Sequence, residues 1–152
     1  MTYEIKLLEL PDQPTLGLRE THAVAELPQF FGKAYGAIMQ YLGKIGEVPT
    51  GMPFAAYYNL DMQHLDVEAG FPVGRALEGQ GEVKSSKIPG GKFVSTIHVG
   101  PYDGVEPAYN ALNEWIKQHG YEPTGVAYEY YLNDPSEKPG VIPETEIRLP
   151  LK

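Results

Sequence analysis

One acidic residue stands inside a run of tyrosines near the end of the chain: Glu129 lies between Tyr128 and Tyr130-Tyr131. Successive side chains of a β-strand point to opposite faces, so Glu129 shares its face with Ala127 and Tyr131. A carboxylate among aromatic rings attracts an organic cation, and each cation–π contact contributes about 0.5–2 kcal/mol. If burial raises its pKa, the same group can act as a general acid or base. The segment therefore predicts either recognition of a cation or acid–base chemistry.

The sequence also repeats itself. Tyr35 is matched by Tyr109 within an ungapped block of residues 74 apart, and a second block, 78 residues apart, matches Glu68 with Glu146. Two copies of about 75 residues indicate a pseudo-two-fold domain with a groove between its halves. Grooves of this kind are where ligands bind.

Glu129 is where the repeat breaks, because the equivalent residue of the first copy is Ala55. Symmetric positions usually serve packing, so a departure from symmetry is a better candidate for chemistry. By the same alternation and symmetry, Ala55 and Tyr57 should share the face of Glu129 and Tyr131. If these strands approach the pseudo-dyad, the site holds one carboxylate, at least two phenols and a small residue that leaves room for a ligand.

A purely structural role for Glu129 is the alternative. If the last two strands pair symmetrically about their loop, Asn133 faces Glu144 and Glu129 faces Arg148. Such a cross-strand ion pair contributes up to about 1 kcal/mol and needs no function. The pattern alone leaves both interpretations open.

Hydrophobic periodicity predicts the elements that position these residues. Apolar residues at helical spacing predict helices over 28–45 and 103–119, the second with Asp103 as its N-cap. We expect one α+β domain over residues 1–152, with pseudo-symmetric repeats of about 1–76 and 77–152. Each repeat holds two strands, a helix and two strands. The eight strands, mostly antiparallel, are expected over 3–8, 16–22, 54–60, 65–73, 81–88, 92–99, 126–133 and 144–151.

Composition excludes several classes of function. The chain has 152 residues, 42% of them hydrophobic, and a net charge of −8 without a basic run, which argues against direct nucleic-acid binding. The absence of Cys excludes disulfides and thiolate sites, and the scattered histidines suggest no metal site. We expect no cofactor. No apolar run approaches the roughly 18 residues that a membrane span needs, so we expect a cytoplasmic protein.

A set of short motifs resembles a known family. Their order and spacing are similar to those of the GyrI-like small-molecule-binding domain, which is also the effector-binding domain of AraC-type and MerR-type multidrug-sensing regulators. The resemblance implies two swapped-hairpin βαββ units around an aromatic pocket, with a glutamate on the third strand of the second repeat, which Glu129 matches. Tyr57, Tyr109, Trp115 and Tyr131 are then the expected aromatic walls around Glu129 and Ala55, although helical spacing equally favours a place in the core for Tyr109 and Trp115. The motifs are Thr96–Tyr102, Trp115-Ile116, Gly120, Gly125, Tyr128–Tyr131, Asn133–Pro135 and Ile147–Pro150.

Three functions follow from the resemblance. The first is a stand-alone protein that binds bulky apolar ligands, often cationic or polycyclic; the chain opens with the first strand, so we expect no DNA-binding domain. The second is a hydrolase of strained-ring, cyclopropane-type genotoxins, with Glu129 as general base and a tyrosine as proton donor. The third is a protein-interaction modulator, such as a gyrase inhibitor, whose acidic surface engages a topoisomerase or a regulator. Binder and hydrolase need the same carboxylate, so the sequence does not separate them.

Overall fold

The structure is a computed structural model and describes residues 3–133 and 140–152. The chain divides into two compact units, one formed by the described residues of 1–10 and 91–152, the other by residues 11–90. Among the described residues each unit contains four antiparallel strands and one main helix. The α+β class, the strands and the two helices predicted from the sequence are therefore confirmed.

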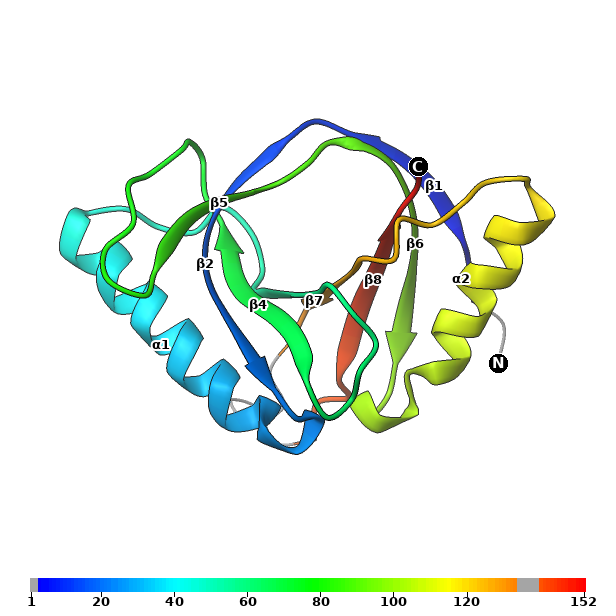
Figure 1. Cartoon of the computed structure of the whole chain (residues 1–152), viewed down its shortest axis with the longest axis horizontal. Helices are drawn as coiled ribbons and strands as arrows, with labels where there is room; N and C mark the ends of the chain where they lie inside the picture. Colours follow the sequence, from blue (N-terminus) through cyan, green and yellow to red (C-terminus); the bar gives the residue numbers. More distant parts are fainter. Residues whose placement is uncertain (1–2, 134–139) are drawn as a thin grey trace. The chain divides into compact units, whose positions relative to one another are not determined.

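The first unit carries the C-terminal helix. Its strands follow the order β1-β6-β8-β7, and every neighbouring pair is antiparallel. Ala108, Leu112 and Ile116 recur at every fourth position of α2 and are buried, so one stripe of the helix packs on the sheet. The elements, labelled in Figure 1, are β1(Lys6–Leu10), β6(Gly91–Val99), η2(Tyr102–Gly104), α2(Glu106–Gln118), β7(Ala127–Tyr131) and β8(Glu144–Pro150).

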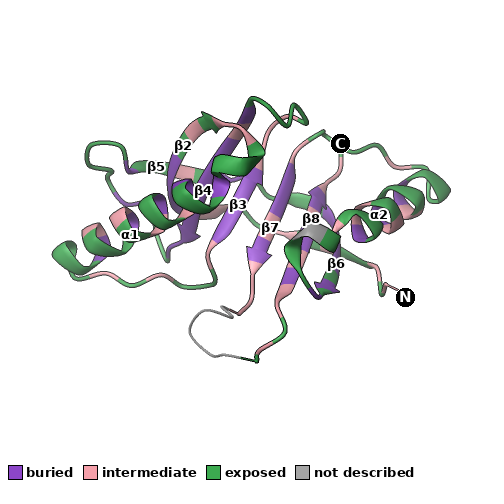
Figure 2. Cartoon of the chain, turned by 90° about the horizontal axis from the view of Figure 1, so that it is seen from below, coloured by how far each residue is buried: buried purple, intermediate pink, exposed green. Residues whose placement is uncertain are grey.

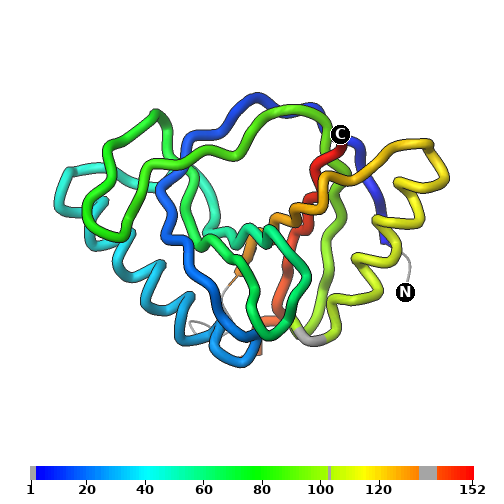
Figure 3. The backbone as a smooth tube through the Cα atoms, in the orientation of Figure 1, coloured from blue at the N-terminus to red at the C-terminus, as the bar shows by residue number. Residues whose placement is uncertain are grey.

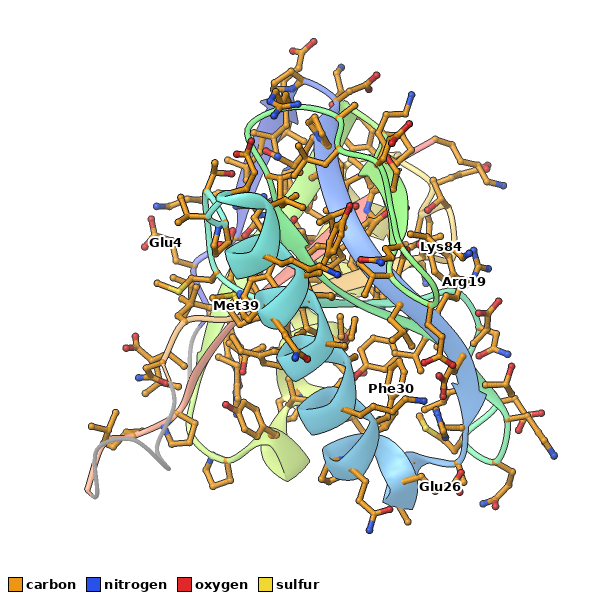
Figure 4. The ribbon with its side chains drawn as sticks, turned by 90° about the vertical axis from the view of Figure 1, so that its left-hand side faces the viewer. Glu4, Arg19, Glu26, Phe30, Met39 and Lys84 are labelled. Carbon is orange, nitrogen blue, oxygen red and sulfur yellow. The ribbon has the colours of Figure 1, made fainter. Side chains whose placement is uncertain are left out.

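The second unit is built in the same way around α1. Its strand order is β3-β4-β2-β5, again antiparallel. Figure 4 shows α1 in front of the sheet, with Glu26 at the N-terminal end of the helix. Ile38 and Leu42 of α1 pack against Leu16 and Phe71 of the sheet. The elements are β2(Gln13–His22), η1(Val24–Glu26), α1(Leu27–Ile45), β3(Phe54–Tyr57), β4(Leu65–Pro72) and β5(Lys84–Ile88).

The two compact units do not coincide with the two halves of the sequence. β1 pairs with β6, and β5 pairs with β2, so the first strand of each repeat joins the sheet of the other repeat. In Figure 3 the chain can be followed as it leaves the first unit after β1 and returns to it at β6. This exchange is the swapped-hairpin pairing that the family resemblance implied.

Burial follows the strands and one stripe of each helix. Figure 2 shows buried residues along the inner strands of both sheets, such as β4 and β6, whereas the edge strands β1 and β5 are mostly exposed and each helix is buried along one stripe. Gly46 and Gly120 adopt a φ of 74° where α1 and α2 end, a left-handed conformation that glycine takes without steric cost. No helix among the described residues is long and apolar enough to cross a membrane.

The predicted N-cap of the second helix is wrong by two residues. α2 begins at Glu106, with Val105 in the N-cap position, and residues 102–104 form a separate 3-10 turn. Pro107 explains the later start, because proline lacks an N–H donor and is favoured in the first turn of a helix.

Candidate functional site

The β7–β8 register fixes which residues surround Glu129. Glu129 lies opposite Ile147, and Tyr131 lies opposite Thr145. β6 extends both rows, since Ile147 pairs with Thr96 and Thr145 pairs with His98. Directly opposed residues share a face, so these six side chains form one patch of the sheet.

Two phenols contact the carboxylate of Glu129. Tyr109, projecting from α2, donates a hydrogen bond to Oε2. Tyr131, two residues along β7, donates to Oε1 over 3.1 Å. Because α2 reaches Glu129 through Tyr109, the helix lies on the same face of the sheet as the carboxylate. Each carboxylate oxygen therefore has one phenol donor, and one of the two donors comes from the helix.

The environment of Glu129 shifts its acidity. Burial raises the pKa of the Glu129 carboxyl, while the Tyr109 and Tyr131 hydrogen bonds and the charge of His98 act in the opposite direction. Burial is the largest of these effects, so the charged form is less favourable here than in water. Such a carboxylate gains more from a neighbouring cation than an exposed one, and it also takes up a proton more readily.

Two residues beside Glu129 were not among the predicted site residues. The ring of Tyr102 meets the ring of Tyr131 edge-on, with 5.5 Å between centroids. His98 lies with Nε2 3.1 Å from the carbonyl oxygen of Pro101 and Nδ1 3.1 Å from the hydroxyl of Tyr3. A carbonyl oxygen only accepts, so Nε2 carries a proton and donates it. The β6–β8–β7 register places His98 in this patch, and the 3-10 turn that follows β6 holds Tyr102 against Tyr131. No local sequence pattern reveals that register.

Thr145 adds a buried polar group to the same patch. Its residue is 0% exposed, and its Oγ1 has no hydrogen-bond partner among the described residues. Thr145 lies between His98 and Tyr131 in its row. A buried hydroxyl without a partner is costly, and such groups often mark the place of a water molecule or of a polar ligand atom.

The second unit has the same framework without the carboxylate. Tyr35 stands on α1 where Tyr109 stands on α2, but its hydroxyl donates to the backbone carbonyl of Phe54 over 2.8 Å. Ala55, the counterpart of Glu129, is fully buried on β3. The asymmetry noted in the sequence is therefore a difference in hydrogen bonding between two equivalent tyrosines, since Tyr109 donates to a carboxylate and Tyr35 to a backbone carbonyl.

The other predicted residues belong to other elements. Trp115, near the end of α2, stacks on His119 with 3.9 Å between ring centroids and on Tyr121 with 5.9 Å. Ala55 and Tyr57 belong to β3 in the second unit, where Tyr57 lies opposite Val67. The structure thus brings Tyr109 and Tyr131 to Glu129. A role in ligand binding stays a prediction for all six residues.

The alternative pairing of Glu129 with Arg148 is wrong. Arg148 lies opposite Tyr128, on the other face of the sheet, and its guanidinium contacts Glu146 at 2.8 Å. The register differs by one residue from the loop-symmetric pairing because the backbone N–H of Leu132, and not that of Asn133, donates a hydrogen bond to the Glu144 carbonyl. A one-residue change of register moves a side chain to the other face.

Asn133 explains this register. Its side-chain oxygen accepts from the Glu144 N–H over 2.9 Å, and its side-chain nitrogen donates to the Ile142 carbonyl over 2.8 Å. The amide side chain closes the hairpin in place of a further backbone pair.

Over the part of the chain that the structure describes, no group of three or more His, Cys, Asp or Glu residues could hold a metal ion.

Comparison with known proteins agrees with the fold and with the motifs. The model of the GyrI-like small molecule binding domain matches residues 3–152. No curated protein matches the chain. In the cryo-EM structure of the EcmrR–DNA complex in EcmrR-RPo, the matched chain is 25% identical with a TM-score of 0.83, and the match covers 99% of this chain and 57% of that one. This chain thus spans less than two thirds of that EcmrR chain.

Two more distant structures share the fold. A hydrolase from Listeria innocua is 16% identical with a TM-score of 0.72, and the match covers 98% of this chain and 92% of that one. SAV2435 bound to tetraphenylphosphonium is 13% identical with a TM-score of 0.67, and the match covers 100% of this chain and 94% of that one.

Proposed function

The chain belongs to the GyrI-like small molecule binding domain family, and from that premise we propose that it binds bulky apolar cations through Glu129. The observation that carries the proposal is the carboxylate itself. Burial raises the pKa of this carboxylate, which accepts hydrogen bonds from the hydroxyls of two tyrosines. None of the ion pairs among the described residues includes Glu129. A ligand cation supplies the direct ion-pair partner that Glu129 lacks among the described residues.

The aromatic residues around Glu129 supply the other half of the recognition. Tyr109 and Tyr131 present rings beside the carboxylate, and Tyr102 packs edge-on against Tyr131. Rings offer apolar surface to a bulky ligand and attract its charge through their faces. A partly desolvated carboxylate strengthens the Coulomb attraction relative to water. The combination favours a large, weakly hydrated cation over a small, strongly hydrated one.

Calorimetric titration with tetraphenylphosphonium tests the proposal, because the charge of this bulky cation does not depend on pH. Glu129→Gln should weaken binding tenfold or more, a loss of about 1.4 kcal/mol or more. Glu114→Gln, which removes a charge from the exposed side of α2, is the matched control and should leave the affinity unchanged. Equal affinity of wild type and Glu129→Gln would remove Glu129 from cation recognition.

A hydrolase is the second candidate, and the pairing of phenols with a carboxylate of raised pKa favours it. Glu129 takes a proton from water, the hydroxide attacks a carbon of a strained ring, and a tyrosine gives its proton to the carbon released by the breaking bond. Mass spectrometry of a cyclopropane-bearing electrophile incubated with the protein tests this. Consumption by wild type but not by Glu129→Gln indicates turnover, whereas binding without product leaves the chain a binding protein.

A further inference from the structure

A second carboxylate lies in the other unit, on the face of its sheet that α1 does not cover. Glu68 of β4 is 6% exposed. Its neighbours along the strand, Val67 and Ala69, point to the opposite face, as does Phe71, which packs against α1. We propose that Glu68 forms a second recognition site, which takes the N–H of a compact aryl amidinium or protonated amine.

The hydrogen bonds of Glu68 leave one of its oxygens available. The hydroxyl of Tyr58 donates to Oε1 over 2.7 Å. Oε2 lies over the backbone of Gly17, close enough that any side chain at Gly17 would overlap it. Among the described residues, no Lys, Arg or His nitrogen lies within ion-pair distance of Glu68. A buried charge without a partner is costly, so a cation at Oε2 stabilises the site.

The closest candidate for an internal partner is engaged elsewhere. Arg19 lies directly opposite Glu68 across the β2–β4 ladder. Its guanidinium instead donates two hydrogen bonds to Asp66, over 2.8 Å and 2.7 Å, and stacks over the Tyr58 ring at 3.8 Å. A guanidinium held by a bidentate carboxylate is fixed in place. Arg19 therefore contributes a positive electrostatic potential at Glu68 without contacting its carboxylate.

In the first unit, the carboxylate at the equivalent position has partners for its oxygens. Glu146, the counterpart of Glu68 in the repeat, accepts from the Ser95 hydroxyl over 2.8 Å and pairs with Arg148. Ser95 and Arg148 lie opposite each other across the β6–β8 ladder. The positions that correspond to them in the second unit are Gly17 and Gly70, also opposite each other. Both partners of Glu146 are thus replaced by glycine around Glu68.

The same neighbours define the size and shape of the ligand. The Phe54 ring lies over Gly70, and the Tyr58 ring stands beside the carboxylate, so the walls of the site are aromatic. A planar cation fits such walls and gains cation–π attraction. The small exposed fraction of Glu68 admits one N–H-bearing group rather than a bulky cation. These features distinguish the site from that of Glu129.

Benzamidine, an aryl amidinium, is the probe, and its neutral amide analogue benzamide is the control. In calorimetric titrations wild type should bind benzamidine at millimolar concentration or below and should bind benzamide at least tenfold more weakly. Glu68→Gln should reduce benzamidine affinity at least tenfold, whereas Glu129→Gln should leave it unchanged. Gly17→Ala, which displaces Oε2 but keeps the charge, should also weaken binding, and circular dichroism confirms that each variant is folded.

The outcomes separate this inference from the proposed function. Benzamidine affinity lost in Glu129→Gln but kept in Glu68→Gln would place the amidinium at Glu129 and overturn a separate site at Glu68. Unchanged affinity in both Glu68→Gln and Gly17→Ala, or no binding to wild type, would overturn it as well. In each of these cases the tetraphenylphosphonium titration of Glu129→Gln still decides the proposed function independently.

Discussion

Tyr109 of α2 donates a hydrogen bond to the carboxylate of Glu129 on β7, so the helix is tied to the sheet through an ionisable group. On α1, the equivalent Tyr35 donates to a backbone carbonyl, which does not titrate. A hydrogen bond to a charged acceptor is roughly twice as strong as one to a neutral acceptor. The contact between α2 and β7 therefore depends on the protonation of Glu129, whereas the contact made by Tyr35 does not depend on pH.

Stability should depend on pH through Glu129. Below the pKa of an ordinary glutamate, about 4.3, the group is protonated in both the folded and the unfolded chain. Burial raises the pKa in the folded state, so as pH rises the unfolded chain loses the proton first, and the free energy of unfolding falls until the folded carboxyl also titrates. Urea denaturation of wild type and Glu129→Gln across this range should show that the variant gains stability relative to wild type as pH rises.

Glu114→Gln controls for the loss of one acidic residue, because Glu114 is exposed on α2. Its difference from wild type should stay nearly constant over the same pH range. If Glu129→Gln instead loses stability relative to wild type as pH rises, the hydrogen bonds from the two phenols outweigh burial and the pKa of Glu129 is lowered, contrary to what we expect.

Removing either phenol should raise the pKa of Glu129 further. The Tyr109 hydrogen bond lowers this pKa more than the Tyr131 hydrogen bond does, so Tyr109→Phe should produce the larger rise. A carboxyl-carbon NMR titration measures the effect directly. Tyr35→Phe is the matched control: it costs about 1 kcal/mol of stability through the lost bond to Phe54 but should leave the titration of Glu129 unchanged.

Periodicity predicted the helices and strands well, because each depends on residues close in sequence. The stripe of Ala108, Leu112 and Ile116 is visible in the sequence itself as a helical pattern. The exchange of first strands was not visible in the pattern. It came only from the family resemblance, because β1 and β6 are far apart along the chain and local spacing does not encode their pairing.

The candidate site was only partly predictable. The repeat singled out Glu129 because it compares equivalent positions directly, whereas helical spacing left Tyr109 equally a core residue or a wall of the pocket. The place of His98 depends on a register running through three strands, and the place of Arg148 depends on how Asn133 closes one hairpin. The two side-chain hydrogen bonds of Asn133 therefore help to decide on which face Arg148 lies, and hydrophobic periodicity does not reveal them.

The two asparagines that close the hairpins should be equally important. Asn133 bonds Ile142 and Glu144, and its counterpart Asn59 bonds the His64 carbonyl and the Asp66 N–H over 2.9 Å and 3.0 Å. Each replacement by alanine removes two hydrogen bonds and should lower the free energy of unfolding by about 1–2 kcal/mol. Chemical denaturation measures the loss. Hydrogen exchange should show faster exchange at the end of β7 for Asn133→Ala and at the end of β3 for Asn59→Ala, each without an effect on the other hairpin.

The ion pair of Glu146 and Arg148 joins two partly buried charges, so the effects of replacing the two residues on stability should not be additive. The side chains are 18% and 26% exposed, and the guanidinium also lies 4.4 Å from the centre of the Tyr130 ring. Arg148→Met removes the cation and leaves the carboxylate with Ser95 alone, so stability should fall by about 1–3 kcal/mol. Adding Glu146→Gln to this variant should recover part of the loss. A double-mutant cycle without coupling would show that the two charges act independently.

Thr145 tests whether the patch beside Glu129 contains a bound polar atom. Thr145 and Thr15 are both almost fully buried, and the hydroxyl of each has no hydrogen-bond partner among the described residues. Valine has nearly the same shape without the hydroxyl, so each replacement should raise the free energy of unfolding by about 1 kcal/mol if the hydroxyl has no partner in solution. Thr15, in the second unit, is the control for the substitution itself. A gain for Thr15→Val together with a loss for Thr145→Val would show that the Thr145 hydroxyl is hydrogen-bonded to a water molecule or ligand beside Glu129. A gain in the free energy of unfolding for both variants would show that the Thr145 hydroxyl has no water or ligand partner.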